Sequence, residues 1–377
     1  MTKIAVLGAG LVGKAIAYDL SQNYDVTSID YNPKALEWVK SNTAAQTQQA
    51  DLSASGNITT LVAPFDLVVI AVPGFMGYAV LESVLKAGKN VVDISFFPED
   101  ATPLHAVALA NNCTAIVDCG VAPGMNNILL GYHNERMQVE QFECLVGGLP
   151  KIKVPPFEYK APFSPLDVIE EYLRPARFLA NGQLVTKPAL SEPEIRHFEP
   201  VGPLESFLTD GLRSLLYTMK HIPDMKEKTL RYPGHVQLIG AFIAAGFLDE
   251  QPVEVNGQFV VPRDVTSKLL LEQWRLGPNE PEFTIMEVNI NGQQDGAPMN
   301  ISYHLYDEFD TNTQLSSMAR TTAFTCTAVV QLLLNGSFDK KGVFPPEIVG
   351  QKTGCCEQVL EYLKARNIHY NLTTKAG

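Results

Sequence analysis

Gly8-Ala9-Gly10-Leu11-Val12-Gly13 is the stretch that decides the fold of this chain. An apolar run of strand length, residues 3–7, precedes the stretch, and apolar residues recur after it at helical spacing as far as Leu20. In a glycine turn between a strand and a helix, the second glycine lets the backbone approach a pyrophosphate, and the third lets the helix pack closely on the strand. The stretch therefore predicts a dinucleotide-binding unit; the alternative is a tight turn in another kind of α/β protein.

An acidic residue follows this turn at the spacing that a ribose contact requires. A second apolar run, residues 25–29, ends at Asp30, twenty-two positions after Gly8. An acid at this place accepts hydrogen bonds from the adenosine ribose, and it repels the 2′-phosphate of NADP. No arginine follows immediately to hold such a phosphate. We expect NAD as the cofactor, bound by Gly8, Gly10, Leu11, Val12, Gly13, Asp30, Val72 and Pro73.

Composition excludes several other classes of protein. With 377 residues the chain is long enough for two domains, and its 46% hydrophobic and 19% charged residues are ordinary for a globular protein. A net charge of −12 without a basic stripe argues against a nucleic-acid partner. No apolar run has the length of a membrane span, and no signal peptide is apparent. Six cysteines without framework spacing fit a cytoplasmic protein with reduced thiols, and no metal-ligand motif is present.

Strands and helices continue to alternate after Asp30, which predicts a doubly wound parallel sheet. Residues 67–72, 90–95 and 114–119 are strand-like, and residues 32–41 and 76–87 are helical in pattern. Ligands bind at the carboxyl ends of such strands. Asp93, Ser95 and Asp118 lie at these ends, so we expect them near the nicotinamide.

The pattern changes near Val121, where a second, mixed α+β domain is expected. Five prolines between Pro150 and Pro165 indicate a loop, and a helix is expected to open at Pro233 and Gly234. Residues 283–290 and 299–306 predict an antiparallel hairpin that turns near Asn291-Gly292. The expected organisation is a Rossmann domain at residues 1–122, a substrate-binding and dimerisation domain at 123–312, and helices at 313–377 that return to the first domain.

Three polar stretches of the second half are candidates for substrate contacts. Arg231 lies at the expected helix start, where the helix dipole disfavours a cation, and a substrate carboxylate would explain its position. His235, one turn later, is a candidate for proton transfer, although a buried structural histidine fits the pattern equally well. Residues 170–177 contain Arg177, and residues 210–213 form a weaker third candidate.

Motifs along nearly the whole chain resemble the saccharopine dehydrogenase family, and within it the branch that oxidises the ε-amine of L-lysine. They include DCGVAPGMNNILLG, SPLDVIEEYLRPAR, TDGLRSLL, KTLRYPGH and FPPEIVG. The resemblance implies a Rossmann domain with an inserted substrate and dimerisation domain. It also implies that Thr229, Leu230 and Arg231 bind the amino-acid part of the substrate and that Ser95 lines the same pocket. The saccharopine reductases of this family use NADP and have an acid at the position of Ala122, and both features differ here.

The resemblance, together with Asp30, implies NAD-dependent oxidation of the ε-amine of L-lysine by an enzyme that acts as a homodimer. The base that deprotonates the ε-amine is expected among His235, Asp93 and Asp118, which the sequence does not rank. One alternative is a saccharopine or carboxynorspermidine dehydrogenase that uses NADP. The other is a nucleotide-sensing regulator without turnover, against which the polar motifs at three strand ends argue.

Overall fold

A computed structural model describes residues 1–53, 55–162, 165–277 and 279–376 of the chain. The chain folds into two compact units. The first unit contains Met1–Gln138 and Met318–Tyr370, and the second contains Val139–Ser317 and Asn371–Gly377. The chain leaves the first unit after Gln138, later than the expected position 122, because helix α6 packs on α12 within the first unit. Ser164, which opens one of the family motifs, lies outside the described residues.

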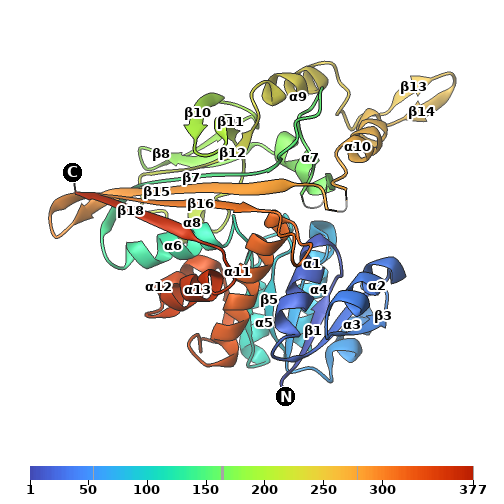
Figure 1. Cartoon of the computed structure of the whole chain (residues 1–377), viewed down its shortest axis with the longest axis vertical. Coiled ribbons are helices and arrows are strands. Elements are labelled where there is room, and N and C mark those ends of the chain that lie inside the picture. The colour runs from blue at the N-terminus through green and yellow to red at the C-terminus, as the bar shows by residue number, and fades with distance from the viewer. Residues whose placement is uncertain (54, 163–164, 278, 377) are drawn as a thin grey trace. The chain divides into compact units, whose positions relative to one another are not determined.

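The first unit is built on a parallel sheet of seven strands in the order β17-β6-β5-β4-β1-β2-β3. This sheet is the expected doubly wound arrangement, with one strand added from the end of the chain (Figure 1). The apolar runs of the sequence account for its centre, since every residue of β4 is buried. The strands are β1 Lys3–Leu7, β2 Asp25–Asp30, β3 Gln46–Gln49, β4 Leu67–Ile70, β5 Asn90–Asp93, β6 Thr114–Ile116 and β17 Gly342–Phe344.

Helices of both chain segments complete the first unit. Asn32 caps α2 through a hydrogen bond from the backbone N–H of Lys34, as the sequence predicts. Buried Asp19 of α1 accepts hydrogen bonds from Thr327 of α11 and Tyr362 of α13, which fastens the returning helices to the nucleotide-binding fold. The helices are α1 Leu11–Leu20, α2 Pro33–Asn42, α3 Ser55–Val62, α4 Gly74–Lys86, α5 Leu104–Ala110, α6 Met125–Asn134, α11 Ser317–Leu334, α12 Pro346–Gln351 and α13 Cys355–Lys364.

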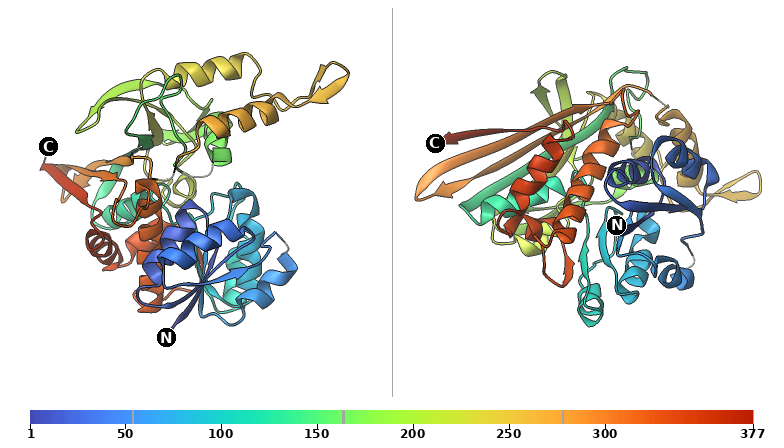
Figure 2. Two further views of the ribbon diagram at one scale, coloured as in Figure 1. Left: turned by 45° about the vertical axis from the view of Figure 1, so that its right-hand side comes forward. Right: turned by 60° about the horizontal axis from the view of Figure 1, so that its bottom comes forward.

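A mixed sheet of nine strands forms the second unit. Its main path is β10-β11-β12-β7-β15-β16-β18, and β8 and β9 are attached beside β12. The C-terminal strand β18, which the sequence did not predict, lies beside β16 (Figures 1 and 2). The strands of this sheet are β7 Gln138–Pro150, β8 Ala176–Ala180, β9 Gln183–Lys187, β10 Glu194–Phe198, β11 Gly202–Leu208, β12 Asp224–Arg231, β15 Glu282–Gln294, β16 Ala297–Glu308 and β18 Tyr370–Ala376.

The long hairpin β15–β16 exists, but its predicted turn is wrong. Asn291 and Gly292 lie inside β15, where they pair with Asn300 and Met299 of β16. The turn is Asp295-Gly296, and both residues have the positive φ angles that a two-residue hairpin loop requires. Strand β15 continues past Gly292, since Gln293 and Gln294 also pair with β16. The outer edge of β16 is covered by β18.

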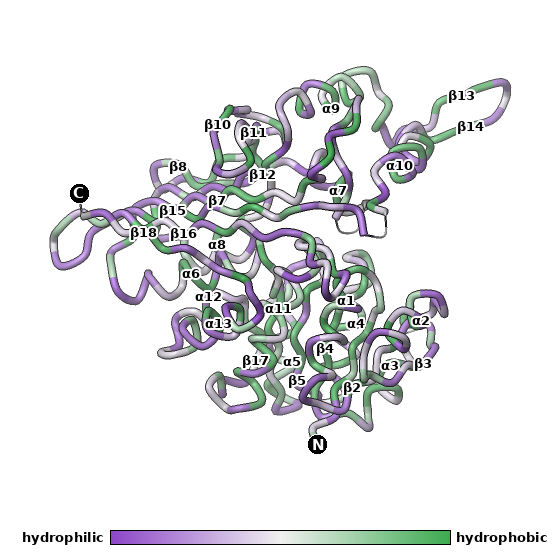
Figure 3. The backbone as a smooth tube through the Cα atoms, viewed as in Figure 1, coloured by the Kyte–Doolittle hydropathy of each residue, from purple (hydrophilic) through white to green (hydrophobic). Residues whose placement is uncertain are grey.

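Helices and a small hairpin surround this second sheet. The hairpin of β13 and β14 extends away from the sheet, and its strands are largely apolar although exposed (Figure 3). The hydrophobic core of this unit lies under α7, α9 and α10, around the fully buried Trp274 and Tyr172. The remaining elements are α7 Pro165–Leu173, α8 Leu215–Thr218, α9 His235–Ala244, α10 Pro262–Gln273, β13 Val253–Val255 and β14 Gln258–Val260.

All six cysteines are buried and free of disulfide bonds. Cys355 and Cys356 are the first two residues of helix α13, and both are buried. Among the described residues, no helix is long and apolar enough to cross a membrane.

Candidate functional site

The glycine turn has the stereochemistry that a dinucleotide requires. Gly8 has φ +105°, and a Cβ on it would come within 2.3 Å of the Ala71 carbonyl oxygen. A Cβ on Gly13 would come within 2.1 Å of the Gly8 carbonyl oxygen, so the protein itself requires glycine at both places. Gly10 differs, since a Cβ there would meet no atom within 4 Å. Its lack of a side chain leaves open the approach to the backbone at the start of α1.

The start of α1 also suits an anion. Gly10 is the N-cap residue and provides no side-chain cap for the first N–H groups of the helix. These groups and the helix dipole favour a phosphate there. Leu11 and Val12 form the first turn, and Leu11 is exposed. The residues present therefore fit a dinucleotide, which these backbone groups would hold by its pyrophosphate.

Asp30 stands at the end of β2, beside this turn. One carboxylate oxygen accepts a hydrogen bond from the Ala9 N–H at 2.7 Å, and the other accepts from the Asn32 N–H at 2.8 Å. A carboxylate can accept about four hydrogen bonds, so capacity remains for two ribose hydroxyls. Asp30 therefore ties the glycine turn to β2, and its carboxylate lies beside the turn, as the expected ribose contact requires.

The polar residues at the other strand ends are more enclosed than expected. Asp93 ends β5 and is fully buried, and one of its oxygens accepts from the N–H of Ser95 at 2.7 Å and from its hydroxyl at 2.5 Å. Gly77 makes room for this serine, because a Cβ there would come within 2.3 Å of the Ser95 hydroxyl. Asp118 is buried with a positive φ. Val72 and Pro73 follow β4, and Pro73 is exposed.

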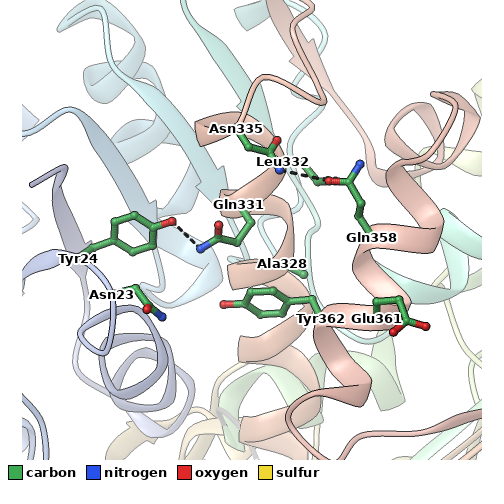
Figure 4. Close-up of a pocket in the computed structure, with 9 residues that line it drawn as sticks. All are labelled: Asn23, Tyr24, Ala328, Gln331, Leu332, Asn335, Gln358, Glu361 and Tyr362. Carbon is green, nitrogen blue, oxygen red and sulfur yellow. Dashed lines mark hydrogen bonds between the residues drawn. The ribbon is translucent and has the colours of Figure 1, made fainter.

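A pocket of about 510 Å³ occurs elsewhere in the first unit, at the opposite end of α1 from the glycine turn. Figure 4 shows the Gln331 amide directed at the Tyr24 hydroxyl, to which it donates at 2.6 Å. None of the sequence-predicted site residues lines it. The lining residues are Asn23, Tyr24, Ala328, Gln331, Leu332, Asn335, Gln358, Glu361 and Tyr362.

Arg231 is the centre of a buried polar cluster in the second unit. It is the last residue of β12 rather than the first of a helix, so the helix-dipole argument for its role was wrong. Only 2% of Arg231 is exposed. Its guanidinium donates to the Tyr172 hydroxyl at 3.0 Å and to the Glu171 carboxylate at 3.2 Å, and it lies over the ring of Tyr159. These contacts offset the free energy of desolvation, which is high for a buried charge without partners.

His235 continues this cluster through a directional chain of hydrogen bonds. Its Nδ1 lies 3.0 Å from the Phe157 carbonyl oxygen, which can only accept, so Nδ1 carries the proton. Nε2 therefore accepts from the Tyr172 hydroxyl at 2.9 Å, and that hydroxyl oxygen accepts from Arg231. Burial and the neighbouring Arg231 lower the pKa of His235 to about 3. Such an imidazole is a weak base, which favours the structural interpretation over proton transfer.

The other substrate-binding candidates have partners within the second unit. Arg177, on β8, makes a two-pronged ion pair with Asp210, with both N–O distances 2.9 Å. The Thr229 hydroxyl lies 3.0 Å from that of Thr209, and Leu230 is fully buried in the core cluster. Leu230 therefore has a packing role, and the polar contacts come from its two neighbours on β12.

Sequence reasoning missed three residues of this cluster, namely Tyr172, Tyr159 and Glu227. Tyr172 lies inside the motif SPLDVIEEYLRPAR, from which the sequence analysis selected Arg177 as the candidate. Glu227 lies two residues before Thr229 and four before Arg231, which is the period-2 spacing of one strand face. Had residues 224–231 been interpreted as a strand, this alternation would have identified it.

The first unit is thus a Rossmann fold whose glycine turn fits a dinucleotide, and the second unit buries an arginine among two tyrosines and a carboxylate. The family model described as the saccharopine dehydrogenase C-terminal domain matches residues 120–368, and the model of the saccharopine dehydrogenase NADP binding domain matches residues 4–116. The chain belongs to the saccharopine dehydrogenase family.

Individual relatives are distant. The mitochondrial α-aminoadipic semialdehyde synthase of Rattus norvegicus is 20% identical over 98% of the chain, which spans 47% of that protein. The chain thus covers about half the length of the synthases that it matches. The carboxyaminopropylagmatine dehydrogenase of Synechocystis is 22% identical, with 92% of each chain covered. The apo saccharopine dehydrogenase (L-Glu forming) of Saccharomyces cerevisiae has the same fold, with a TM-score of 0.81, 17% identity and complete coverage of both chains.

Proposed function

We propose that this protein oxidises the ε-amine carbon of L-lysine with NAD. The substrate amine and NAD⁺ yield an imine, NADH and a proton, and water then releases 2-aminoadipate 6-semialdehyde and ammonia. The observation that carries the proposal is the cluster around Arg231, where a guanidinium and the Glu171 carboxylate lie together within a largely apolar core. An amino acid carries charges of both signs, and such a cluster offers a partner for each.

The chain's own residues have defined tasks in this reaction. Arg231 presents a planar fork that suits the α-carboxylate, and Tyr172 and Tyr159 hold the fork in place. The cofactor supplies the hydride acceptor, and the start of α1 would hold its pyrophosphate. Asp93 and Asp118 stay candidates for proton transfer at the carboxyl ends of the Rossmann strands. His235 is proposed as a positioning residue that orients Tyr172.

NAD rather than NADP is proposed because of Asp30. Its carboxylate is fixed by two backbone N–H groups at the place where the 2′-phosphate of NADP would lie. The family model is described as an NADP binding domain, and the relative from Schizosaccharomyces pombe is a saccharopine dehydrogenase named for NADP(+) and 24% identical. Cofactor choice thus distinguishes the proposed branch from those relatives.

A second candidate is a dehydrogenase of a carboxyalkylated amine, of the kind that the Synechocystis relative's name indicates. It is favoured by the match with this relative, which covers 92% of both chains. Its substrate would be a secondary amine longer than lysine, and NADP would be the expected cofactor.

We also propose a homodimer formed through the second unit. Within the described residues, β18 lies at the end of the sheet order, and Leu372 on it is about half exposed. An uncovered strand edge of this kind favours pairing with another chain. Light scattering at micromolar concentration should give the mass of a dimer, and a monomer would contradict the proposal.

One assay tests the activity. Purified protein is mixed with NAD or NADP and a panel containing L-lysine, L-norleucine, cadaverine, L-ornithine, saccharopine and carboxyalkylated diamines, and reduced nicotinamide is followed by absorbance. The proposal expects the highest kcat/KM with lysine and NAD. Turnover confined to secondary amines with NADP would favour the second candidate, and no turnover with any amine would contradict both.

A further inference from the structure

Glu227 is a buried carboxyl group for which the reaction as described has no use. It lies on β12 and is 5% exposed, and its Oε2 has no hydrogen-bond partner among the described residues. Buried carboxyl groups without such partners are costly, so their presence requires an explanation.

The fold makes room for this carboxyl. A Cβ on Gly211 would come within 1.8 Å of the Glu227 Oε2, so the absence of a side chain at residue 211 is what lets the carboxyl occupy its place. Gly211 belongs to the stretch 210–213, which the sequence singled out and to which the proposed function gives no task. Asp210 of the same stretch is held by Arg177. The stretch thus shapes the surroundings of Glu227.

Glu227 shares one face of β12 with Thr229 and Arg231, because alternate residues of a strand project to the same side. At a rise of about 3.3 Å per residue, Glu227 and Arg231 are about 13 Å apart along the strand. Glu171 is near both, since it pairs with Arg231 and its charge acts on Glu227. The face therefore carries an anion-binding group at one end and a carboxyl at the other, and it suits an elongated molecule with an anion and an amine at its ends.

We propose that Glu227 binds the ε-amine of the substrate and accepts its proton, while Arg231 binds the α-carboxylate; this inference rests on the proposed oxidation of a lysine-like amine. The ε-ammonium gives a proton to the Glu227 carboxylate and becomes a neutral amine, and Glu227 becomes a carboxylic acid. The neutral amine then has the nitrogen lone pair that the C=N bond requires, and a bound nicotinamide would supply the acceptor for the hydride of the ε-carbon.

The surroundings tune Glu227 for this task. Burial, together with the charges of Glu171 and Asp210, raises the pKa of Glu227 to about 8, and the charge of Arg213 opposes this rise. An alkylammonium has a pKa of about 10.4 and an ordinary glutamate about 4.3, so a carboxyl near 8 is a much better acceptor of the amine proton. His235, with its pKa near 3, is far less suited.

The test compares Glu227→Gln with a matched control on the same sheet. Glutamine keeps the size of the side chain and cannot ionise. Glu143→Gln is the control, since Glu143 lies on the neighbouring β7 and pairs with Arg196 and Lys226. We expect Glu227→Gln to lower kcat by a factor of about 10²–10⁴ and to abolish the rise of kcat/KM with pH towards 8, while the control keeps both. A kcat within threefold of wild type and an unchanged pH profile would overturn the inference.

A binding measurement separates this inference from the proposed function. L-Lysine and L-norleucine share the carboxylate, but only lysine has the ε-amine. We expect lysine to raise the Tm of the wild-type protein more than norleucine does, and Glu227→Gln to remove the difference. If the protein prefers another amine of the panel, that substrate's pH profile tests Glu227 in the same way and only the choice of lysine fails. Equal shifts by both ligands in the wild-type protein would overturn the role of Glu227.

Discussion

The hydroxyl of Tyr172 lies 2.9 Å from Nε2 of His235. This contact links Phe157 to Arg231 in a chain of hydrogen bonds, in which the donor and the acceptor of each bond are determined. The Phe157 carbonyl can only accept and the Arg231 guanidinium can only donate. Tyr172 must therefore donate to His235 and accept from Arg231. Burial raises the pKa of Tyr172 to about 12, so the hydroxyl keeps its proton at neutral pH. The chain of hydrogen bonds holds Arg231 in one orientation.

Replacing Tyr172 with phenylalanine should break this chain in the middle. The His235 Nε2 and the Arg231 Nε would each lose a buried partner, which we expect to cost about 1–3 kcal/mol of unfolding free energy. KM for lysine should rise more than kcat falls, because the guanidinium loses its orientation. Urea unfolding and steady-state kinetics measure the two effects. Tyr306→Phe is the control, since the Tyr306 hydroxyl bonds to the half-exposed Glu308; equal losses in both variants would contradict a special role for Tyr172.

His235→Gln should change the pH dependence of stability. The folded pKa of about 3 lies below the value of about 6.5 expected in the unfolded chain. Above pH 6.5 both states are neutral and the stability is complete. Between pH 6.5 and 3 only the unfolded state binds the proton, so stability falls as pH falls, by up to about 1.4 kcal/mol for each pH unit. His235→Gln should lose this pH-dependent part of the stability, and its turnover rate should stay within about tenfold of wild type. If turnover instead slowed by a factor of about 10²–10⁴ while the Tm stayed unchanged, His235 would be the proton-transfer group.

Asn-Gly pairs occur at two hairpin turns that the sequence analysis did not predict and at one place where it predicted a turn wrongly. Asn181-Gly182 and Asn256-Gly257 both have positive φ angles and close the hairpins β8–β9 and β13–β14, so these hairpins were predictable. Asn291-Gly292 has the same letters and lies inside β15, which pairs with β16 as far as Gln294 and has β7 as its other neighbour in the sheet. The conformational preference of a few adjacent residues does not include such pairing between strands.

The two halves of the candidate site differed in how far the sequence revealed them. The glycine turn and Asp30 were predictable because their chemistry is set by a few adjacent residues and one fixed spacing. The cluster around Arg231 was not, because Tyr159, Tyr172 and Glu227 come from separate elements that only the folded sheet brings together. The strand assignment of β12 was the missing step.

Gly10→Ala should weaken cofactor binding without weakening the fold. Gly10 has φ −67°, and a Cβ there would meet no protein atom within 4 Å, so alanine is tolerated by the protein itself. A methyl group at that place would stand in the path of a pyrophosphate. We expect an unchanged Tm in the absence of cofactor and at least a tenfold increase in the Kd for NAD. Gly56→Ala, also without nearby atoms, is the control. Unchanged NAD affinity would show that the pyrophosphate lies elsewhere.

Asp30 should set the preference for NAD over NADP. We expect at least a tenfold preference in kcat/KM, equivalent to about 1.4 kcal/mol, because the carboxylate binds the ribose and repels a 2′-phosphate. Asp30→Ala should lower kcat/KM with NAD and raise it with NADP. The variant also loses the bonds to Ala9 and Asn32, so its Tm is measured in parallel. Equal use of both cofactors by the wild-type protein would contradict this role.

Arg231→Lys should separate carboxylate recognition from simple charge. Lysine keeps the positive charge beside Glu171 but loses the planar fork and the donor to Tyr172. We expect kcat/KM for L-lysine to fall at least tenfold, mostly through KM, while the Kd for NAD stays unchanged; Arg231→Ala should raise KM about a hundredfold. Arg196→Lys is the control, because Arg196 makes a two-pronged pair with Glu143 in the same sheet. Cadaverine has the amine but no carboxylate, so its turnover should be nearly the same in wild type and Arg231→Lys. If cadaverine loses as much rate as lysine, Arg231 supports the fold of the cluster and the carboxylate is bound by another group.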